Sequence, residues 1–269
     1  MKIVRYKKIE SSSVKWGCLE GDMIHTLIGD PLKNPTQGPQ VGKLQDNLLM
    51  APCQPTKVIA AAINYHGATD WEPGMTEPLF FLKLGTSVCS PSDPIVSYFS
   101  DVPTWGEAEL AIVIGKRVQR ATEAEAAAAI LGYTVANDAS AENYGKRDHH
   151  LARSKAADSF CPLGPYIDTD YDPTDRMIEG FHNDKLVRKG STKDLYWGPN
   201  KIVHWLSSWM TLEPWDVILT GSPPLQGPLT YFEDGDTFTA CVNGFPPIKS
   251  AFKQAVPLSA DARNKFFKE

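Results

Sequence analysis

The sequence predicts an α+β fold that is mostly β, with a small N-terminal domain in front of a larger one. Short apolar or alternating segments of strand length recur through most of the chain, whereas helical periodicity is confined to a few segments. Strands and helices do not alternate regularly along the chain, which disfavours a doubly wound parallel sheet.

The first strands belong to the small unit. Lys2–Tyr6 and Val14–Leu19 alternate as strands do, and Gly21–Asp22 is typical of a hairpin turn. The stretch Pro31–Gly42, rich in proline, glycine, asparagine and glutamine, is expected to be a loop. We therefore predict a small N-terminal domain over residues 1–52, a catalytic metal-binding domain over 53–254 and a C-terminal tail over 255–269.

The larger unit is rich in predicted strands. They are expected at Lys57–Ile63, Leu79–Leu84, Glu107–Ile114, Tyr133–Asn137, Trp215–Thr220 and Asp236–Val242. A capping box at Thr122–Glu125 opens an alanine-rich helix that we expect to end at Gly132. A second helix is expected over Lys201–Met210, and a short one in the tail, Ser259–Glu269.

Composition excludes several classes of protein. Of the 269 residues, 42% are hydrophobic and 22% are charged, as in ordinary globular domains. The net charge is -5 without a sustained basic run, so we expect no nucleic-acid partner. No segment has the apolar length of a membrane span, and Met1–Tyr6 lacks the core of a secretion signal, so we expect a cytoplasmic protein without membrane contact. The scattered cysteines favour neither disulfides nor a zinc–thiolate site.

Two acidic residues on one strand are the first chemical signal. Glu107 and Glu109 are two positions apart, so their side chains project from the same face. Adjacent carboxylates repel each other unless a cation lies between them, and oxygen donors suit magnesium, manganese or calcium better than zinc. Taken alone, the pair is also typical of a solvated strand end. A third donor, Asp138 at the end of the next predicted strand, favours a metal site.

Further motifs follow in the sequence. Lys155 is suited to stabilise a developing enolate beside a metal ion. The turn Thr220–Gly221–Ser222 follows a strand and offers a backbone amide and a hydroxyl to a carboxylate ligand.

Together these motifs resemble the fumarylacetoacetate hydrolase family over about Lys57 to Val242. The matching segments, in order, are Ala62–Tyr65, Leu79–Lys83, the strand with Glu107 and Glu109, Gly132–Ser140, Lys155 with Asp158 and Pro162–Pro165, and Ile218–Pro223. The resemblance implies a mixed β-sandwich roll, a homodimer, a Mg²⁺ or Mn²⁺ ion and a small oxo-acid substrate. It places the metal ligands at Glu107, Glu109 and Asp138, and substrate-binding groups at Tyr65, Lys83, Lys155, Thr220, Gly221 and Ser222.

The sequence departs from the family pattern at three places. Where many members carry a histidine and, three residues later, a glutamate that activate water, this chain has Ala68 and Trp71. His66 lies two residues early, and either serves as the base with Asp70 or Glu72 orienting it, or only packs there.

The second departure is Glu142, which stands where members with a dicarboxylate-like substrate often have an arginine. Its loss weakens the case for a second substrate carboxylate unless Lys146, Arg147 or Arg153 compensates, and a neutral, aromatic or larger substrate is an equal alternative. The third is Trp215, which replaces a turn glycine, so we expect a different turn there, with Trp215 at an interface.

The first functional hypothesis is a metal-dependent hydrolase that cleaves a carbon–carbon bond in a 2,4-dioxo, acylpyruvate-like acid, with His66 activating water. The second keeps the enolate without water activation, as in a tautomerase, isomerase, dehydratase or decarboxylase of a 2-oxo acid. The third is a non-catalytic binding protein, which the clustered acids argue against because unneutralised carboxylates are costly to bring together.

Overall fold

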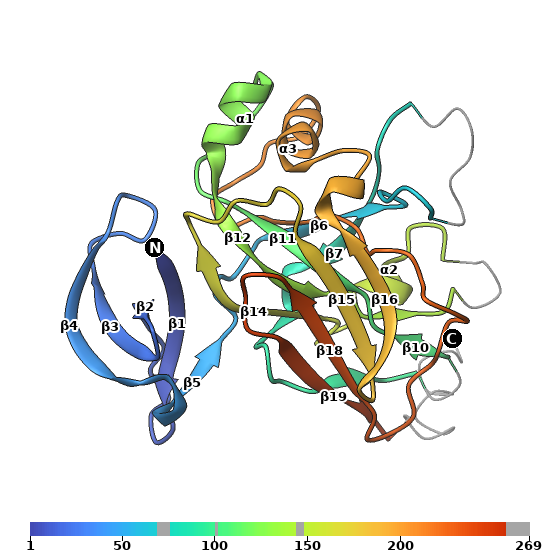
Figure 1. Ribbon diagram of the computed structural model, residues 1–269, viewed down its shortest axis with the longest axis horizontal. Helices are drawn as coiled ribbons and strands as arrows, with labels where there is room; N and C mark the ends of the chain where they lie inside the picture. The colour runs from blue at the N-terminus through green and yellow to red at the C-terminus, as the bar shows by residue number, and fades with distance from the viewer. Residues whose placement is uncertain (69–75, 100–101, 144–147, 257–269) are drawn as a thin grey trace, which may run out of the picture.

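The computed structural model describes residues 1–68, 76–99, 102–143 and 148–256, and these form a mostly β protein in which two main sheets pack together. The larger sheet runs in the order β4-β3-β2-β1-β14-β12-β11-β17-β6-β7, with β5 beside β1 and β8 beside β14 (Figure 1). Its strands are β1 (Lys2–Lys8), β2 (Lys15–Glu20), β3 (Met23–Ile28), β4 (Thr36–Lys43), β5 (Asn47–Met50), β6 (Lys57–Ala62), β7 (Leu79–Leu84), β8 (Val88–Cys89), β11 (Ala108–Ile114), β12 (Ile130–Asn137), β14 (Cys161–Asp168) and β17 (Val217–Leu219).

The second sheet covers one face of the first. It runs β16-β15-β18-β19-β9, and its strands β15 and β18 pack against β11 and β12. Its strands are β9 (Ile95–Ser97), β15 (Met177–His182), β16 (Lys185–Ser191), β18 (Thr237–Val242) and β19 (Ile248–Gln254), and a separate pair joins β10 (Thr104–Trp105) to β13 (Ser140–Ala141). This arrangement is the mostly β sandwich that the sequence predicts.

The N-terminal strands form a lobe at one side of the molecule, seen at the left of Figure 1. The lobe is joined to the body because β1 pairs with β14, Lys2 lying opposite Asp168. The expectation of a loop over Pro31–Gly42 is wrong for its second half, since β4 pairs with β3 as the edge of the large sheet. An edge strand tolerates Pro39 because one side of its backbone needs no ladder partner.

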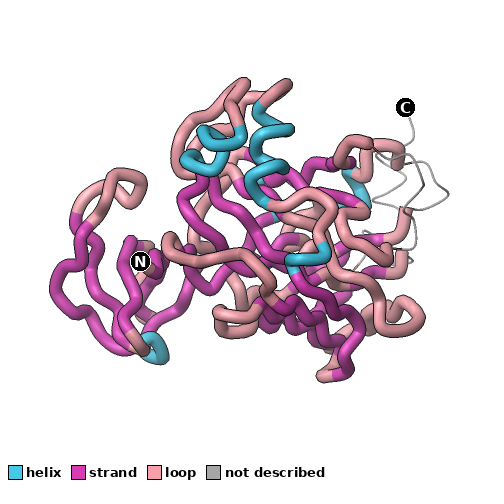
Figure 2. The backbone as a smooth tube through the Cα atoms, turned by 45° about the horizontal axis from the view of Figure 1, so that its top comes forward, coloured by secondary structure: helices cyan, strands magenta, loops and turns pink. Residues whose placement is uncertain are grey.

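The helices are short, and α1 and α3 pack together at one end of the body, whereas α2 lies apart from them beside β7 and β13 (Figures 1 and 2). They are α1 (Glu123–Ala129), α2 (Ala152–Lys155) and α3 (Pro199–Ser207), with single 3-10 turns at Leu44–Asp46, Gly85–Ser87 and Thr192–Asp194. The capping box is confirmed, because Thr122 accepts from the Glu125 amide and Glu125 accepts from the Thr122 amide. The helix nevertheless ends at Ala129 instead of Gly132, since β12 already begins at Ile130.

Strands β11 and β12 position the site. All seven residues of β11 are buried, because the second sheet covers one face and the remaining core covers the other. Gly106, just before β11, is required by packing: a Cβ there would lie 2.4 Å from the Phe238 ring.

Among the described residues, none of the helices combines the length and apolar character that a membrane crossing requires. The expected tail helix, Ser259–Glu269, lies outside the described residues.

Candidate active site

Three carboxylates meet where β11 begins and β12 ends. Glu107 directly precedes β11, Glu109 lies on it, and Asp138 directly follows β12. The strands are antiparallel, with Ala108 opposite Asn137, so the start of one lies beside the end of the other. One oxygen from each of the three carboxylates lies within 4.8 Å of the others. The structure therefore brings together the three acids that the sequence analysis grouped as a candidate metal site.

Glu107 is surrounded by donors. Its Oε2 accepts from the Lys155 ammonium at 2.8 Å. Its Oε1 accepts from Arg188 Nη2 and from the Trp105 indole, each at 3.0 Å. Burial alone would raise the pKa of Glu107, but Lys155 and Arg188 outweigh burial and lower the pKa to about 2.

Asp138 lies between two lysines. Lys83 donates to Oδ1 at 2.6 Å and Lys155 donates to Oδ2 at 2.7 Å. Burial by itself would lower the pKa of Lys155, yet Asp138 and Glu107 raise it above its ordinary value, so Lys155 stays protonated. Lys155 also lies over the Phe81 ring, 4.7 Å from its centroid.

Glu109 is the least compensated acid of the three. Its Oε2 accepts the Gly221 amide at 2.6 Å. Burial, followed by the charges of Asp138 and Glu107, raises its pKa well above the ordinary value. A carboxylate in this state gains most from a cation placed among the three acids.

The turn after β17 contributes backbone and a hydroxyl. Gly221 has φ 102°, which favours glycine, and a Cβ there would lie 3.0 Å from the Asn64 Cβ. Thr220 donates its hydroxyl to the Leu110 carbonyl, so this side chain builds the turn. The Ser222 hydroxyl has no hydrogen-bond partner among the described residues, and Ser222 lines the cleft beside the acids.

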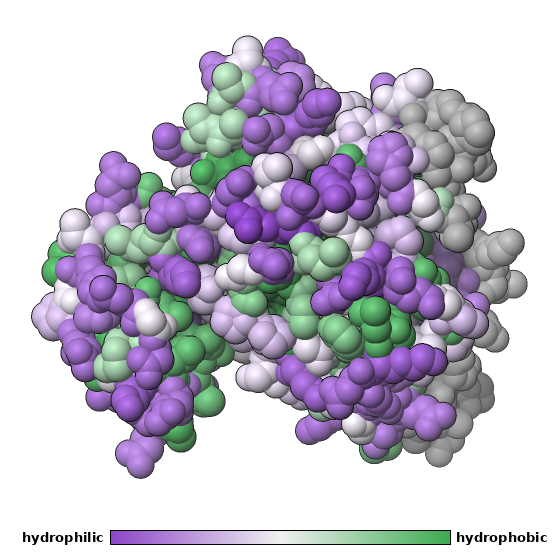
Figure 3. All heavy atoms as spheres, in the orientation of Figure 1, coloured by the Kyte–Doolittle hydropathy of each residue, from purple (hydrophilic) through white to green (hydrophobic). Residues whose placement is uncertain are grey.

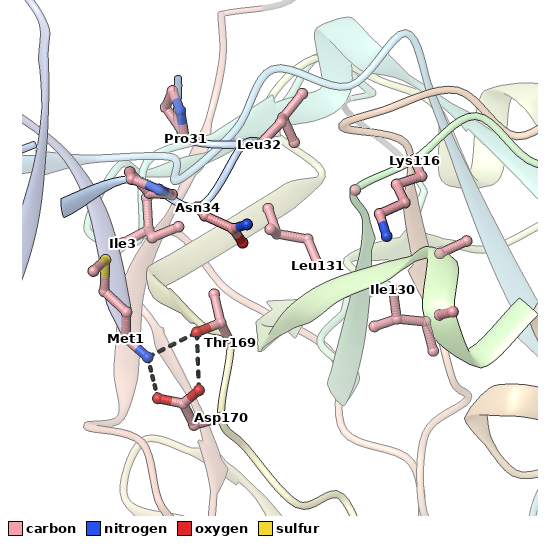
Figure 4. Close-up of a pocket in the computed structure, with 14 residues that line it drawn as sticks. Met1, Ile3, Pro31, Leu32, Asn34, Lys116, Ile130, Leu131, Thr169 and Asp170 are labelled. Carbon is pink, nitrogen blue, oxygen red and sulfur yellow. Dashed lines mark hydrogen bonds and ion pairs between the residues drawn. The ribbon is translucent and has the colours of Figure 1, made fainter. Parts of the chain in front are cut away.

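The cluster opens into a cleft of about 650 Å³. Its charged lining residues are Glu107, Glu109, Asp138, Lys155 and Arg188, and the rest of the lining includes Phe81, Trp105 and the segment Pro223–Leu225. A second hollow, about 450 Å³, lies between the N-terminal lobe and the body (Figure 4). Its single acidic side chain, Asp170, pairs with the N-terminal amino group (Figure 4), so no carboxylates converge there. Hydrophilic side chains dominate the face shown in Figure 3.

Several residues that the sequence singled out lie elsewhere. His66 is exposed and its ring packs on Tyr196, with 3.8 Å between ring centroids. His66 is not among the residues that line the cleft, although its neighbours Gly67 and Ala68 are. Lys83 and Tyr65 are fully buried and do not line the cleft either. Asp70 and Glu72 lie outside the described residues.

Arg188 is the site residue that sequence reasoning missed. It lies on β16 in the second sheet, 81 positions from Glu107, and its neighbour Lys189 is exposed as on an ordinary surface strand. No local motif distinguishes it, so only the packing of the two sheets reveals it. Of the cations that the sequence offered, Arg153 stacks on Phe99 at 4.5 Å, whereas Lys146 and Arg147 lie outside the described residues.

The donor set fits a hard divalent cation such as Mg²⁺ or Mn²⁺. Such ions prefer carboxylate oxygens and take about six ligands, so three protein carboxylates leave positions for a small chelating molecule. Zinc is less suited because no histidine or cysteine belongs to this group of described residues.

Comparison with known proteins agrees with this architecture. Residues 57–253 match the family model described as fumarylacetoacetate (FAA) hydrolase C-terminal, and residues 1–52 match the one described as Rv2993c-like, N-terminal. The chain belongs to the fumarylacetoacetate hydrolase family.

Among the relatives of this family member, two carry different activities in their names. Protein Rv2993c of Mycobacterium tuberculosis is 37% identical to this chain over an aligned region that covers 80% of this chain and 82% of Rv2993c. The oxaloacetate tautomerase fahd2 of Xenopus laevis is 37% identical over 70% of this chain and 63% of its own. The crystal structure of 5-carboxymethyl-2-hydroxymuconate delta-isomerase from Mycobacterium smegmatis has a TM-score of 0.85 and 35% identity, covering 95% of this chain and 100% of the other.

Proposed function

We propose that this protein is a divalent-metal-dependent enzyme that tautomerises or isomerises a small 2-oxo acid through its enolate. Lys155 carries the proposal: its ammonium lies between Glu107 and Asp138, and the residue lines the cleft. A fixed cation at this position stabilises negative charge that develops on a substrate oxygen. The tautomerase and isomerase activities named for two relatives support the same chemistry.

The roles of the residues follow from their charges. Glu107, Glu109 and Asp138 would hold the ion, for which we propose Mg²⁺ or Mn²⁺. When bound, the ion would act as a Lewis acid that polarises the 2-oxo group. Because Asp138 and Glu107 raise the pKa of Lys155, that side chain stays an ammonium and stabilises the enolate instead of removing a proton. Ser222, whose hydroxyl has no partner among the described residues, is suited to donate to the substrate carboxylate.

The position of His66 favours a reaction without water activation. A general base must come within hydrogen-bond reach of the proton that it removes. His66 is exposed beside Tyr196, and the described lining residues of the cleft include no histidine.

Hydrolysis of a carbon–carbon bond in a 2,4-dioxo acid, the first hypothesis from the sequence, becomes the second candidate. The observation that favours it is that Gly67 and Ala68 line the cleft, so the segment with His66 borders the site. In that case His66, with Asp70 or Glu72, would activate water, and Lys155 would keep its role.

One pair of assays separates the two functions. The first follows the enol–keto conversion of oxaloacetate, and the second follows pyruvate release from acylpyruvates, each with Mg²⁺ added or chelated. We expect Mg²⁺-dependent conversion in the first assay and the same rate in His66→Ala. Pyruvate release that collapses in His66→Ala would instead establish hydrolysis, and no metal-dependent turnover in either assay would refute both.

We also propose a homodimer, as the family resemblance implies. Strand β7 is an edge of the large sheet, and its Leu82 and Leu84 are 51% and 57% exposed. Light scattering should give twice the mass of the chain, and Leu82→Glu should lower that mass if this edge is the contact.

A further inference from the structure

One segment beside the cleft, residues 227–231, is held by very few hydrogen bonds. Before it, the Gln226 amide donates to a carbonyl of β16 at 2.9 Å, and after it the Phe232 amide donates to a carbonyl of β10 at 2.8 Å. Between these two points, the described residues supply a single hydrogen bond, at the Thr230 hydroxyl. Leu229 of this segment lines the cleft, so the position of this part of the wall depends strongly on that bond.

His182, at the end of β15, is the partner of that hydroxyl. Its Nδ1 lies 2.8 Å from Thr230 Oγ1, and its Nε2 lies 2.9 Å from Asp236 Oδ2. Because a carboxylate only accepts hydrogen bonds, Nε2 carries a proton, and the neutral imidazole then accepts the Thr230 hydroxyl at Nδ1. The Glu233 amide and the Asn183 side chain also donate to Asp236, which fixes the carboxylate behind the histidine.

The order of carboxylate, imidazole and hydroxyl is also that of a catalytic triad, but this triad has no room for a substrate. A nucleophile needs space beside its hydroxyl for the group that it attacks. The hollow that His182 and Thr230 line has a volume of about 10 Å³, which at most one water molecule fills. The Phe232 ring lies edge-on against the imidazole, with 5.1 Å between centroids. These residues therefore hold a position instead of carrying out a reaction.

The hydrogen bond at Thr230 reaches the cleft through both neighbours of this residue. Leu229 lines the cleft directly. Tyr231 lies edge-on against Trp105, with 6.1 Å between ring centroids, and Trp105 also lines the cleft. His182 is not among the described residues that line the cleft, so it can influence a ligand only through this wall.

We propose that His182, anchored by Asp236, is a positioning residue that holds the wall segment 227–231 in the place that a bound ligand requires. The inference rests on the proposed function in one respect, that the ligand is a small 2-oxo acid held through the metal ion. It gives a role to a histidine that lies outside the cleft and takes no part in the enolate chemistry.

Local proteolysis tests the hydrogen bond itself, without ligand or turnover. Thr230→Val removes the hydroxyl and keeps the shape of the side chain. Chymotrypsin cleaves after tyrosine, and Tyr231 is 44% exposed, so cleavage after Tyr231 reports how often the segment leaves its place. Mass spectrometry of the fragments should show about fivefold faster cleavage at this bond in Thr230→Val, the change expected from the loss of one hydrogen bond.

Two further variants show whether the hydroxyl is responsible. Thr230→Ser keeps the hydroxyl and should restore the wild-type cleavage rate. Thr26→Val is the matched control, because the Thr26 hydroxyl donates to the Pro39 carbonyl in the N-terminal lobe. It also loses one hydrogen bond, yet cleavage after Tyr231 should not change.

Ligand binding tests whether this hydrogen bond serves the cleft. Isothermal titration calorimetry with Mg²⁺ compares oxalate, which is little more than a metal chelator, with 2-oxohexanoate, whose apolar chain extends beyond the chelating atoms. We expect Thr230→Val and His182→Ala each to weaken 2-oxohexanoate about two- to fivefold, because the ligand must then supply the free energy that orders the wall. Oxalate and Mg²⁺ should bind as in the wild type. The double variant should be no weaker than either single variant, since both remove the same bond.

Several outcomes overturn the proposal. Cleavage after Tyr231 at the wild-type rate in Thr230→Val, or no recovery in Thr230→Ser, would show that the hydroxyl does not hold the segment. Equal losses for oxalate and 2-oxohexanoate, or unchanged binding of both, would show that the bond does not act through the wall. A wild type that does not bind 2-oxohexanoate with Mg²⁺ also contradicts the inference, whereas conversion of oxaloacetate decides separately whether the proposed function stands.

Discussion

Lys155 and Asp138 form an ion pair inside the protein, with 2.7 Å between Nζ and Oδ2. The Asp138 side chain is 1% exposed and that of Lys155 is 11% exposed, so water contributes little to either charge. A buried pair of this kind is strongly coupled, because removal of one partner leaves the other charged and unpaired. The lysine is therefore tied both to the charge of the acid cluster and to the chemistry of the cleft.

Replacement of Lys155 should separate these two roles. We expect Lys155→Met to lower kcat by about 10²–10³-fold, since one donor to a developing oxyanion contributes about that much. Its affinity for Mg²⁺ should not fall, because the acids lose a competing cation. Turnover of oxaloacetate and calorimetric titration of Mg²⁺ measure the two effects, with Lys193→Met as control because Lys193 forms an exposed pair with Asp175. Unchanged turnover, or lost Mg²⁺ binding, would contradict the assigned role.

Glu109 should make the metal-free protein less stable at higher pH. Burial and the charges of Asp138 and Glu107 raise its folded-state pKa, so the folded state holds a proton that the unfolded state has released above about pH 4.3. Stability therefore falls as the pH rises from that value through the folded pKa. Glu109→Gln removes this penalty and should raise the Tm of the metal-free protein at pH 8, with the gain shrinking as the pH falls.

With Mg²⁺ added, the wild type should have a higher Tm than Glu109→Gln. The wild type gains Tm by binding the ion, whereas Glu109→Gln lacks one carboxylate and should gain much less. Differential scanning calorimetry from pH 5 to pH 8, with EDTA or Mg²⁺, measures both effects. Glu213→Gln is the control, since Glu213 is paired at the surface with Arg117. A gain that does not depend on pH would be inconsistent with a raised pKa of Glu109.

The acid cluster could be predicted from the sequence because it depends on local strand geometry. Glu107 and Glu109 share a face through strand periodicity, and Asp138 ends the neighbouring strand, so one hairpin brings them together. Arg188 obeys no such rule, because its place depends on how the second sheet packs on the first. Strand β4 escaped prediction for a related reason: its residues have weak β-propensity, and pairing at the sheet edge overrides that preference.

Trp215 shows how tertiary contacts can override a backbone preference. The expected change of turn is wrong, because Trp215 keeps a positive φ of 74°. Its ring stacks on Trp16 of the N-terminal lobe, with 4.9 Å between centroids, so Trp215 packs at the junction between the lobe and the body. The stack holds a side chain in a conformation that costs about 1–2 kcal/mol outside glycine.

This strain predicts that a glycine variant is more stable to unfolding than an alanine variant at position 215, the reverse of the usual order. Trp215→Gly and Trp215→Ala both remove the stack, but alanine keeps the strain and glycine relieves it. We expect the glycine variant to be about 1 kcal/mol more stable to unfolding than the alanine variant, whereas glycine is ordinarily the less stable residue. Urea denaturation measures the difference, and Trp16→Ala reports the loss of the stack alone. Equal stabilities, or a more stable alanine variant, would refute strain at this turn.

Asp236 should stabilise the fold at neutral pH and lose this effect in acid. Burial opposes the shift, but hydrogen bonds from the Glu233 amide, Asn183 and His182 lower the pKa of Asp236. Because the folded-state pKa lies below the unfolded value of about 3.9, the contribution is complete above that pH and disappears as the pH falls through the folded pKa. Asp236→Asn should therefore cost about 1 kcal/mol at pH 7 and almost nothing near pH 2. Urea denaturation of both proteins at each pH measures the loss of stability.

Asp184→Asn is the control, since the Asp184 side chain is 84% exposed, and this variant should change the stability little at either pH. A cost for Asp236→Asn that stays constant with pH would assign the effect to packing instead of charge.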